Sequence, residues 1–159
     1  MTHSVPAESW FSLSFAQRSR WFMYRMDPAM QGCHNNGFAA RVLGRLEFDA
    51  LSDAITQLVA RHPMLRTCYR ERDGEPEQCV RAAAPVSVTA HVVGSEDIAL
   101  LAHRVASDFV KPFDLARPAL IRAALYRINA AEAVLALTFD HIAGDGWSYW
   151  QLIDELSVL

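Results

Sequence analysis

The sequence predicts an α/β fold in which helices cover a mixed β-sheet, and three observations support this prediction. Short apolar runs rich in β-forming residues alternate with stretches of helical periodicity. Some predicted strands are joined by tight turns, whereas others are separated by helices, so hairpins and crossovers occur in one chain. The 159 residues are 52% hydrophobic and 21% charged, which suits one globular domain with a real core.

Composition and charge argue against several classes of protein. The formal net charge is -3 and no basic block is present, which disfavours nucleic-acid binding. No apolar run approaches the length of a membrane span, and the first residues lack the basic segment and apolar core of a signal peptide. The three cysteines have no CxxC spacing, so we expect a cytoplasmic protein with reduced thiols. No His or Cys pair has the spacing of metal ligands, and we predict no metal site.

The first predicted helix begins after Ser14, which is its expected N-cap. Gln17 follows three residues later, as in a capping box, and Asp27-Pro28 ends the helix. Before it, residues 1–9 are expected to form a loose lead-in. After it, residues 30–37 are expected to form a loop and residues 38–46 a strand.

A second helix is expected to begin at Asp49, its predicted N-cap, and to end at His62-Pro63. Its apolar residues recur at i, i+3, i+4, i+7 and i+8, which places them on one face: Leu51, Ala54, Ile55, Leu58 and Val59. We interpret His62 as an ordinary residue at a helix end, because it is followed by Pro63.

A hairpin is predicted next, with strands 65–72 and 75–80 around a turn at Asp73-Gly74. In this register Cys68 lies opposite Cys79, and we interpret the two thiols as packing neighbours rather than a disulfide. Arg70 lies opposite Glu77. Pro76 has no amide proton to donate, so we expect its strand to lie at a sheet edge.

The second half of the chain is predicted to contain three strands and two helices. Strands are expected at residues 86–93, 121–127 and 134–139, with a tight connection at 129–132. Ser95 is the expected N-cap of a helix whose apolar face comprises Ile98, Leu101, Ala102, Val105 and Phe109. A last helical stretch covers residues 147–159, with Trp150, Ile153 and Leu156 spaced at three.

The segment between that last strand and the last helix is the best candidate for a functional site. His141 lies at the mouth of a strand, and a Gly-Asp-Gly turn then opens a helix. Loops at strand ends are common positions for catalytic groups. Gly146 allows close approach of the backbone to a ligand, and a helix N-terminus offers amide donors to an anion.

Three separated stretches of the sequence form a recognisable series, and a loop at Pro112-Phe113-Asp114-Leu115 belongs with them. The first is Ser14-Phe15-Ala16-Gln17 with Trp21. The second is Arg61-His62-Pro63-Met64-Leu65-Arg66-Thr67 with Tyr69. The third is His141-Ile142-Ala143-Gly144-Asp145-Gly146-Trp147-Ser148 with Leu152. In this order and at these separations they resemble the core motifs of the condensation domains of nonribosomal peptide synthetases. The third resembles the active-site motif HHxxxDGWS.

The resemblance implies a fold and a domain boundary. It implies two lobes of chloramphenicol-acetyltransferase-like topology with the active site between them. A whole domain of this kind is well over twice as long as this chain. Residues 1–159 are therefore expected to form the N-terminal lobe, and the C-terminal lobe is expected to lie outside this chain.

The resemblance also implies a reaction and its partners. An acyl thioester donor and an aminoacyl acceptor would form an amide bond, each carried on the phosphopantetheine of a peptidyl carrier domain. The expected partners are the donor and acceptor carriers and the C-terminal lobe, and no cofactor is expected to bind directly. Two tethered substrates that meet in one tunnel gain effective concentration.

The resemblance implies a role for each motif residue. His141 is the expected base or hydrogen-bond positioner for the amine, and the backbone amide of Gly146 is expected to oppose the oxyanion. Asp145 is expected to be largely structural, with Arg66 as the candidate cation beside it. The supporting residues are Asp140, Trp147 and Ser148, of which Trp147 is interpreted as a core anchor.

Departures from the family pattern leave alternatives open. Ser19 and Arg20 stand where the first motif usually has Arg and Leu, and Asp140 stands where the third usually has its first His. Asp140, Asp145 and Ser148 satisfy the DxxxxDxxS pattern of heterocyclisation domains. A non-catalytic relative that only binds a carrier or partner is a further alternative, whereas the retained His141 favours ordinary condensation.

Overall fold

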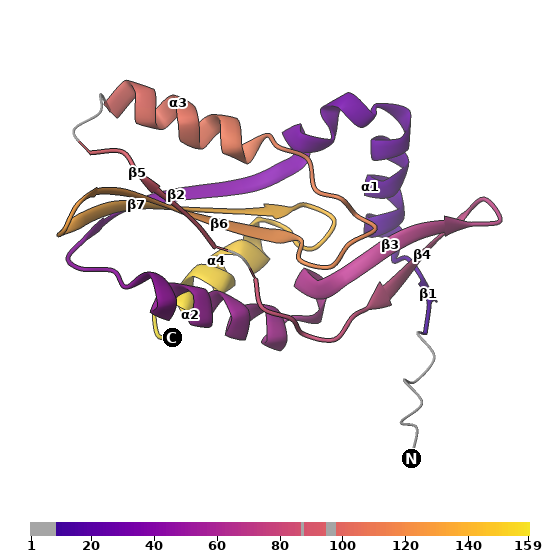
Figure 1. Cartoon of the computed structure of the whole chain (residues 1–159). Helices are drawn as coiled ribbons and strands as arrows, with labels where there is room; N and C mark the ends of the chain where they lie inside the picture. The colour runs from indigo at the N-terminus through magenta and orange to yellow at the C-terminus, as the bar shows by residue number, and fades with distance from the viewer. Residues whose placement is uncertain (1–8, 87, 95–97) are drawn as a thin grey trace, which may run out of the picture.

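The computed structural model describes residues 9–86, 88–94 and 98–159. Within these ranges the chain forms two β-sheets and four α-helices (Figure 1). The larger sheet has the strand order β2-β7-β6-β5, with bounds β2 Asn35–Leu43, β5 Val88–Val92, β6 Ile121–Asn129 and β7 Glu132–Asp140. β7 is antiparallel to β2 and β6, whereas β5 is parallel to β6. The predicted mixed sheet is therefore confirmed.

Helices cover both faces of the larger sheet. In Figure 1, α2 (Phe48–Arg61) and α4 (Gly146–Leu156) lie on one side, and α3 (Ile98–Phe109) lies on the other. On the α2 side, Ile55 and Leu58 pack with Phe139 in one buried cluster. On the α3 side, Leu101 and Val105 pack against the sheet in another cluster. These layers agree with the predicted α/β class.

The smaller sheet has the order β1-β4-β3, with bounds β1 Phe11–Ser12, β3 Thr67–Arg72 and β4 Glu75–Val80. The predicted hairpin is confirmed, since Cys68 pairs with Cys79 and Arg70 with Glu77. No disulfide joins these two described cysteines, as predicted. The expectation that β4 is an edge strand is wrong, because β1 pairs with it at Glu77 and Gln78. β1 ends before it reaches Pro76, so no neighbour needs an amide proton from that proline.

Helix α1 (Phe15–Met26) begins as predicted. The Ser14 side chain accepts from the Gln17 amide at 3.3 Å, and the Gln17 side chain accepts from the Ser14 amide at 2.8 Å. Asp27 is its C-cap, and a 3-10 helix, η1 (Pro28–His34), follows.

Several boundaries differ from the predictions. β2 begins at Asn35 rather than Phe38, because Asn35 pairs with Asp140 in the register with β7. The predicted loop 30–37 is therefore partly η1 and partly strand. The N-cap of α2 is Glu47, and Asp49 lies in the first turn instead. His62 is the C-cap of α2 as predicted, and a second 3-10 helix, η2 (Pro63–Arg66), follows it.

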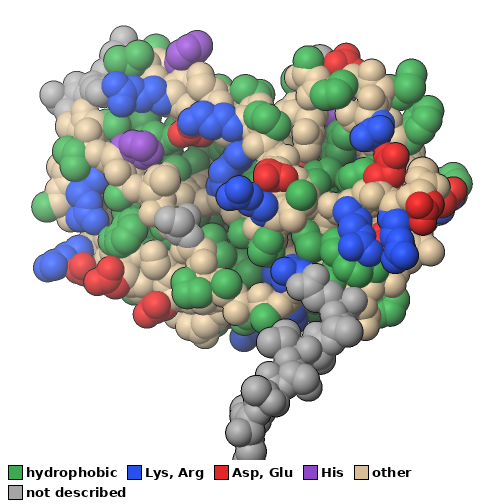
Figure 2. Space-filling model, turned by 45° about the vertical axis from the view of Figure 1, so that its right-hand side comes forward, with side chains coloured by type: hydrophobic (Ala, Val, Ile, Leu, Met, Phe, Trp, Pro, Cys, Tyr) green, Lys and Arg blue, Asp and Glu red, His purple; other side chains and the backbone are tan. Residues whose placement is uncertain are grey.

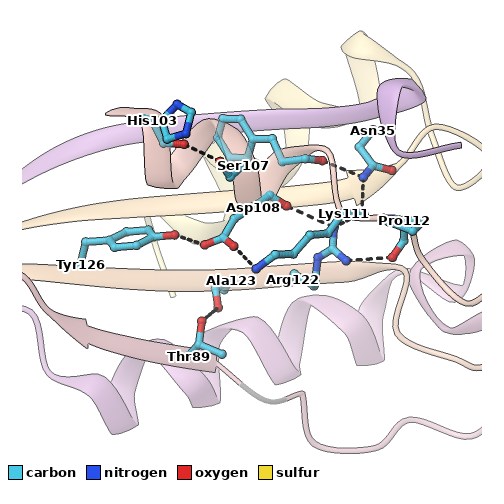
Figure 3. A network of polar contacts seen from close by, with 11 residues as sticks. Asn35, Thr89, His103, Ser107, Asp108, Lys111, Pro112, Arg122, Ala123 and Tyr126 are labelled. Atoms are coloured by element: carbon cyan, nitrogen blue, oxygen red, sulfur yellow. Dashed lines mark hydrogen bonds and ion pairs between the residues drawn. The ribbon is translucent and has the colours of Figure 1, made fainter. Parts of the chain in front are cut away.

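The end of α3 is fastened to the sheet by a polar network (Figure 3). Asp108 accepts hydrogen bonds from Tyr126 and Lys111. Burial acts to raise the pKa of Asp108, but these hydrogen bonds hold it below its ordinary value. The Asn35 side chain donates to the carbonyl oxygens of Phe109 and Lys111, each at 2.8 Å. This fixes the start of β2, which pairs with Asp140.

The predicted apolar face of α3 is only partly buried. Leu101 and Val105 are buried, whereas Ile98 is 82% exposed. Ser95, the expected N-cap, lies outside the described residues.

The loop between α3 and β6 connects the two sheets. The Tyr69 amide donates to the carbonyl of Leu115 at 2.7 Å, and the Leu120 amide donates to the carbonyl of Leu65 at 2.9 Å. The Asp140 amide then donates to the carbonyl of Leu120 at 3.1 Å. The end of β7 is thus tied through this loop to the smaller sheet.

The face in Figure 2 carries charges of both signs. Lys and Arg side chains lie interspersed with Asp and Glu side chains, and hydrophobic side chains lie between them. Among the described helices, none has the length and apolar character needed to cross a membrane.

Candidate active site

His141 lies in a pocket at the end of β7. The pocket has a volume of about 570 Å³ and is bounded by α1, the turn after β7 and the first turn of α4. Ile142 is buried in a cluster with Leu13 and Tyr69, which anchors the turn. The Ala143 amide donates to the carbonyl of Asp140 at 3.0 Å and closes it. His141 itself is half-buried.

Two hydrogen bonds define the tautomer of His141. Its Nε2 lies 2.9 Å from Nη2 of Arg20, and its Nδ1 lies 2.9 Å from the carbonyl oxygen of Gly144. Arg can only donate and a carbonyl can only accept. His141 is therefore a neutral imidazole whose Nδ1–H donates to Gly144 and whose Nε2 lone pair accepts from Arg20. In this tautomer Nε2 is the ring nitrogen that carries no proton.

Asp140 is adjacent to His141 but is completely buried, with 0% exposure. Its Oδ1 accepts from the Tyr24 hydroxyl at 2.8 Å and from the Ile142 amide at 2.9 Å. Its Oδ2 is buried without a partner among the described residues. Burial raises the pKa of Asp140, although the hydrogen bonds from Ile142 and Tyr24 act against the rise. Asp140 therefore holds the turn and does not line the pocket.

Asp145 is the N-cap of α4. Its Oδ1 accepts from the Ser148 amide at 3.0 Å and from the Ser148 hydroxyl at 2.8 Å. These bonds hold the pKa of the Asp145 carboxyl below its ordinary value. Both residues line the pocket with His141. Gly146 is the first residue of α4 and is exposed, and it does not line this pocket.

One supporting residue at the start of α4 is placed differently from the expectation. Trp147 is 83% exposed, so its interpretation as a core anchor is wrong. Leu152 is buried in the core instead, and Tyr149 packs against Phe139 with ring centroids 5.1 Å apart. Trp150 is 59% exposed, which shows that the apolar residues of α4 extend beyond the buried face.

Arg66 is not the cation beside Asp145. Its Nη1 donates to the carbonyl oxygen of Arg81, and its Nε is buried without a partner among the described residues. No ion pair joins Arg66 to Asp145 within the part of the chain that the structure describes. The motif resemblance suggested this pair, but Asp145 takes its partners from Ser148.

The structure adds three residues of α1 to the site. Gln17, Arg20 and Tyr24 follow at i, i+3 and i+7, so they share one helix face. Arg20 contacts His141 and Tyr24 contacts Asp140, whereas Gln17 donates to Gln78 at 2.9 Å. This spacing is visible in the sequence, but nothing in the sequence indicates which face of α1 meets the turn 121 positions later.

No group of three or more His, Cys, Asp or Glu side chains able to hold a metal ion occurs among the described residues.

Comparisons with known proteins agree with the geometry. The family model for the condensation domain matches residues 7–159. The probable non-canonical nonribosomal peptide synthetase CymA of Salinispora arenicola is 37% identical over 145 residues, which cover 91% of this chain and 2% of that protein. The chondramide synthase cmdD of Chondromyces crocatus is 32% identical over 159 residues, which cover 98% of this chain and 4% of that protein. The chain thus spans only a small part of the length of these relatives.

Solved structures share the fold. The first condensation domain of the calcium-dependent antibiotic synthetase, in complex with substrate analogue 3a, superposes with a TM-score of 0.83 at 21% identity. That match covers 93% of this chain and 37% of the solved chain. A mutant of the starter condensation domain of rhizomide synthetase RzmA, in complex with C8-CoA, superposes with a TM-score of 0.83 at 19% identity. That match covers 93% of this chain and 34% of the solved chain. The chain thus spans roughly a third of these solved chains, and it belongs to the condensation-domain family.

Proposed function

We propose that residues 1–159 form the N-terminal lobe of a condensation domain and supply the base for amide bond formation. One observation carries the proposal: a neutral His141, whose Nε2 accepts a hydrogen bond from Arg20, lines a pocket of about 570 Å³ together with that arginine. The family match and the shared fold support the same reaction class. The donor is an acyl thioester and the acceptor an aminoacyl group, both on the phosphopantetheine arms of carrier domains.

The geometry supports a defined course of proton transfer. The amine of the acceptor attacks the thioester carbonyl and gives a proton to Nε2 of His141. The intermediate then collapses, the C–S bond breaks, and the leaving thiolate takes up that proton. The Nδ1–H bond to Gly144 keeps the ring in the orientation that this transfer requires.

The start of α4 has the supporting role. Asp145 and Ser148 fix the helix N-terminus beside the pocket, where the helix dipole favours negative charge. The Gly146 amide is the proposed backbone contribution to the oxyanion, acting from the first turn of that helix. Asp145 thus contributes by position rather than by proton transfer.

This proposal requires a second lobe to cover the pocket and complete it. Its partners are the C-terminal lobe and the donor and acceptor carrier domains, and no resident cofactor takes part. A reducing compartment such as the cytoplasm suits Cys33, Cys68 and Cys79, none of which forms a disulfide within the described residues.

The test is single-turnover transfer between loaded carriers in the intact synthetase that contains this chain. We expect a linear amide whose mass equals the donor plus the acceptor, and we expect its formation to depend on His141. Absence of any transfer by the wild-type protein would favour a non-catalytic relative that only binds carriers.

Heterocyclisation is the second candidate, and the surroundings of Asp140 argue against it. In the DxxxxDxxS pattern this carboxylate would belong to the reacting site, but here it is fully buried and bonded to Tyr24 and Ile142. The same transfer assay with Cys, Ser or Thr as the acceptor distinguishes the two reactions. A product that has lost one further water is a heterocycle.

A further inference from the structure

The guanidinium of Arg20 differs from those of its neighbours on α1. Arg18 pairs with Glu75 at 2.7 Å, and Arg25 pairs with Glu71 at 3.4 Å. Arg20 is half-buried, and within the described residues its one hydrogen bond is to neutral Nε2 of His141. The pocket therefore contains a cation that forms no ion pair with a carboxylate of the described residues, directly beside the proposed base.

This hydrogen bond occupies the lone pair that proton transfer needs. An amine that gives its proton to Nε2 must first replace Arg20 as the hydrogen-bond partner of Nε2. This frees the guanidinium N–H donors of Arg20 next to the reacting atoms. The reaction then creates a negative charge on the former carbonyl oxygen. In a half-buried pocket a nearby cation stabilises such a charge more strongly than in water.

We propose that Arg20 is a catalytic residue that stabilises the tetrahedral oxyanion, an inference that rests on the proposed function. The amine nitrogen forms the C–N bond while the C=O electron pair moves onto oxygen, and Arg20 donates to that oxygen. When the C–S bond breaks, the carbonyl re-forms, the sulfur leaves with its electron pair, and the proton held by His141 goes to the thiolate. Arg20 returns unchanged to Nε2.

The position of Arg20 complements that of the α4 N-terminus. Gly146, the backbone donor at that terminus, does not line the pocket, whereas Arg20 and His141 both line it. A charged donor also gives stronger hydrogen bonds to an oxyanion than a neutral amide gives. Arg20 is thus a charged donor that lines the pocket and contacts His141.

The test separates the contribution of the Arg20 charge from that of its hydrogen bonds. The assay is single-turnover transfer by the intact synthetase, with carriers loaded with alanine, leucine, lysine or aspartate. Arg20→Leu should reduce the transfer rate by about 10²–10³-fold, the size found on removal of an oxyanion donor. Arg20→Gln keeps a donor for Nε2 without the charge and should lose as much. Arg20→Lys keeps the charge and should retain part of the rate. Arg18→Leu, on the same helix but paired with Glu75, is the matched control and should leave the rate unchanged.

Each outcome supports or overturns the proposal. A wild-type rate in Arg20→Gln would show that the charge is not needed and that Arg20 only positions His141. A loss confined to aspartyl-loaded carriers would instead make Arg20 a recognition group for a substrate carboxylate. If His141→Ala is inactive but Arg20→Leu transfers normally, this inference fails and the proposed function stands. If the wild type does not transfer, both fail. Melting temperatures, together with the Gln and Lys variants, separate a fault in folding from a fault in chemistry.

Discussion

His141 and Asp140 are adjacent in the sequence, but their side chains lie in different surroundings. His141 faces the pocket and has two polar neighbours, Arg20 and Gly144. Asp140 points into the core, where the Tyr24 hydroxyl and the Ile142 amide both donate hydrogen bonds to its Oδ1. The first residue is therefore suited to proton transfer and the second to holding the turn that presents it.

Alanine at these two positions should have opposite effects. His141→Ala should lower single-turnover transfer in the intact synthetase by about 10²-fold or more, as expected for a lost proton acceptor, with little change in stability. Asp140→Ala leaves the Tyr24 hydroxyl and the Ile142 amide without their partner, so it should cost about 1–3 kcal/mol of folding free energy. Transfer rates and melting temperatures of both variants check this. The reverse ranking, with Asp140→Ala folded but inactive and His141→Ala active, would assign the chemistry to the carboxylates.

The buried carboxyl of Asp140 predicts a pH dependence of stability. Burial raises its pKa in the folded state, so the folded state binds this proton more tightly than the unfolded state. The contribution of Asp140 to stability is thus fully present below its unfolded pKa of about 4 and is lost as pH rises through the folded pKa. Asp140→Asn keeps an acceptor for Tyr24 but carries no charge.

The stability of Asp140→Asn relative to the wild type should therefore increase with pH and then level off. Urea unfolding of both chains at a series of pH values from mildly acidic to slightly alkaline measures this difference. Tyr24→Phe is the comparison variant: it keeps the buried carboxyl but removes a hydrogen bond that opposes the rise in the pKa of Asp140, so its stability should remain dependent on pH. If the difference in unfolding free energy between Asp140→Asn and the wild type stays constant, or shrinks as pH rises, then burial does not raise the pKa of Asp140 as assigned.

At the scale of single elements, the features set by local chemistry were predictable and those set by tertiary contacts were not. The capping box of α1 and the register of the Asp73-Gly74 hairpin depend on neighbouring residues, and both predictions are confirmed. The start of β2 depends on the pairing of Asn35 with Asp140, which lies far along the chain. A polar residue such as Asn has low strand propensity, so the sequence alone places this boundary too late.

The same limit applies to the candidate site. The motif located His141 at a strand end and Asp145 at a helix start, because both are local features. Spacing could not show that Arg20 contacts His141, since this contact depends on how α1 packs against the turn. Likewise, helical periodicity marks an apolar stripe on α4 but does not tell which of Trp147, Trp150 and Leu152 is buried.

The capping box of α1 supports a test at the scale of the element. Ser14→Ala removes the side-chain acceptor for the Gln17 amide and should destabilise the chain by about 1 kcal/mol, the usual cost of a lost N-cap. Ser19→Ala, an exposed position within the same helix, is the matched control and should be neutral or slightly stabilising. Urea unfolding of the two variants measures both. Equal effects would mean that Ser14 does not act as a cap.

At the scale of the whole molecule, one side of the chain has apolar surface and an unpaired strand. Trp147 and Trp150 on α4 are exposed, and so is Leu159 at the last position of the sequence. An apolar groove of about 340 Å³ is bounded by β2, α2 and the end of α4. In the described sheet, β2 is also an edge strand. Exposed apolar patches and open edges both favour association.

We therefore expect the 159-residue chain alone to form oligomers whose size increases with concentration, and to be inactive in transfer without a facing lobe. Light scattering over a dilution series measures the association. The double variant Trp147→Gln/Trp150→Gln should shift it towards the monomer, because it removes the two largest exposed apolar side chains of α4. Ile98→Gln is the matched control, since this residue is 82% exposed but lies on α3, on the other side of the sheet, and should leave association unchanged. A wild-type chain that stays monomeric at all concentrations and transfers at the full rate would contradict its assignment as one lobe of a larger domain.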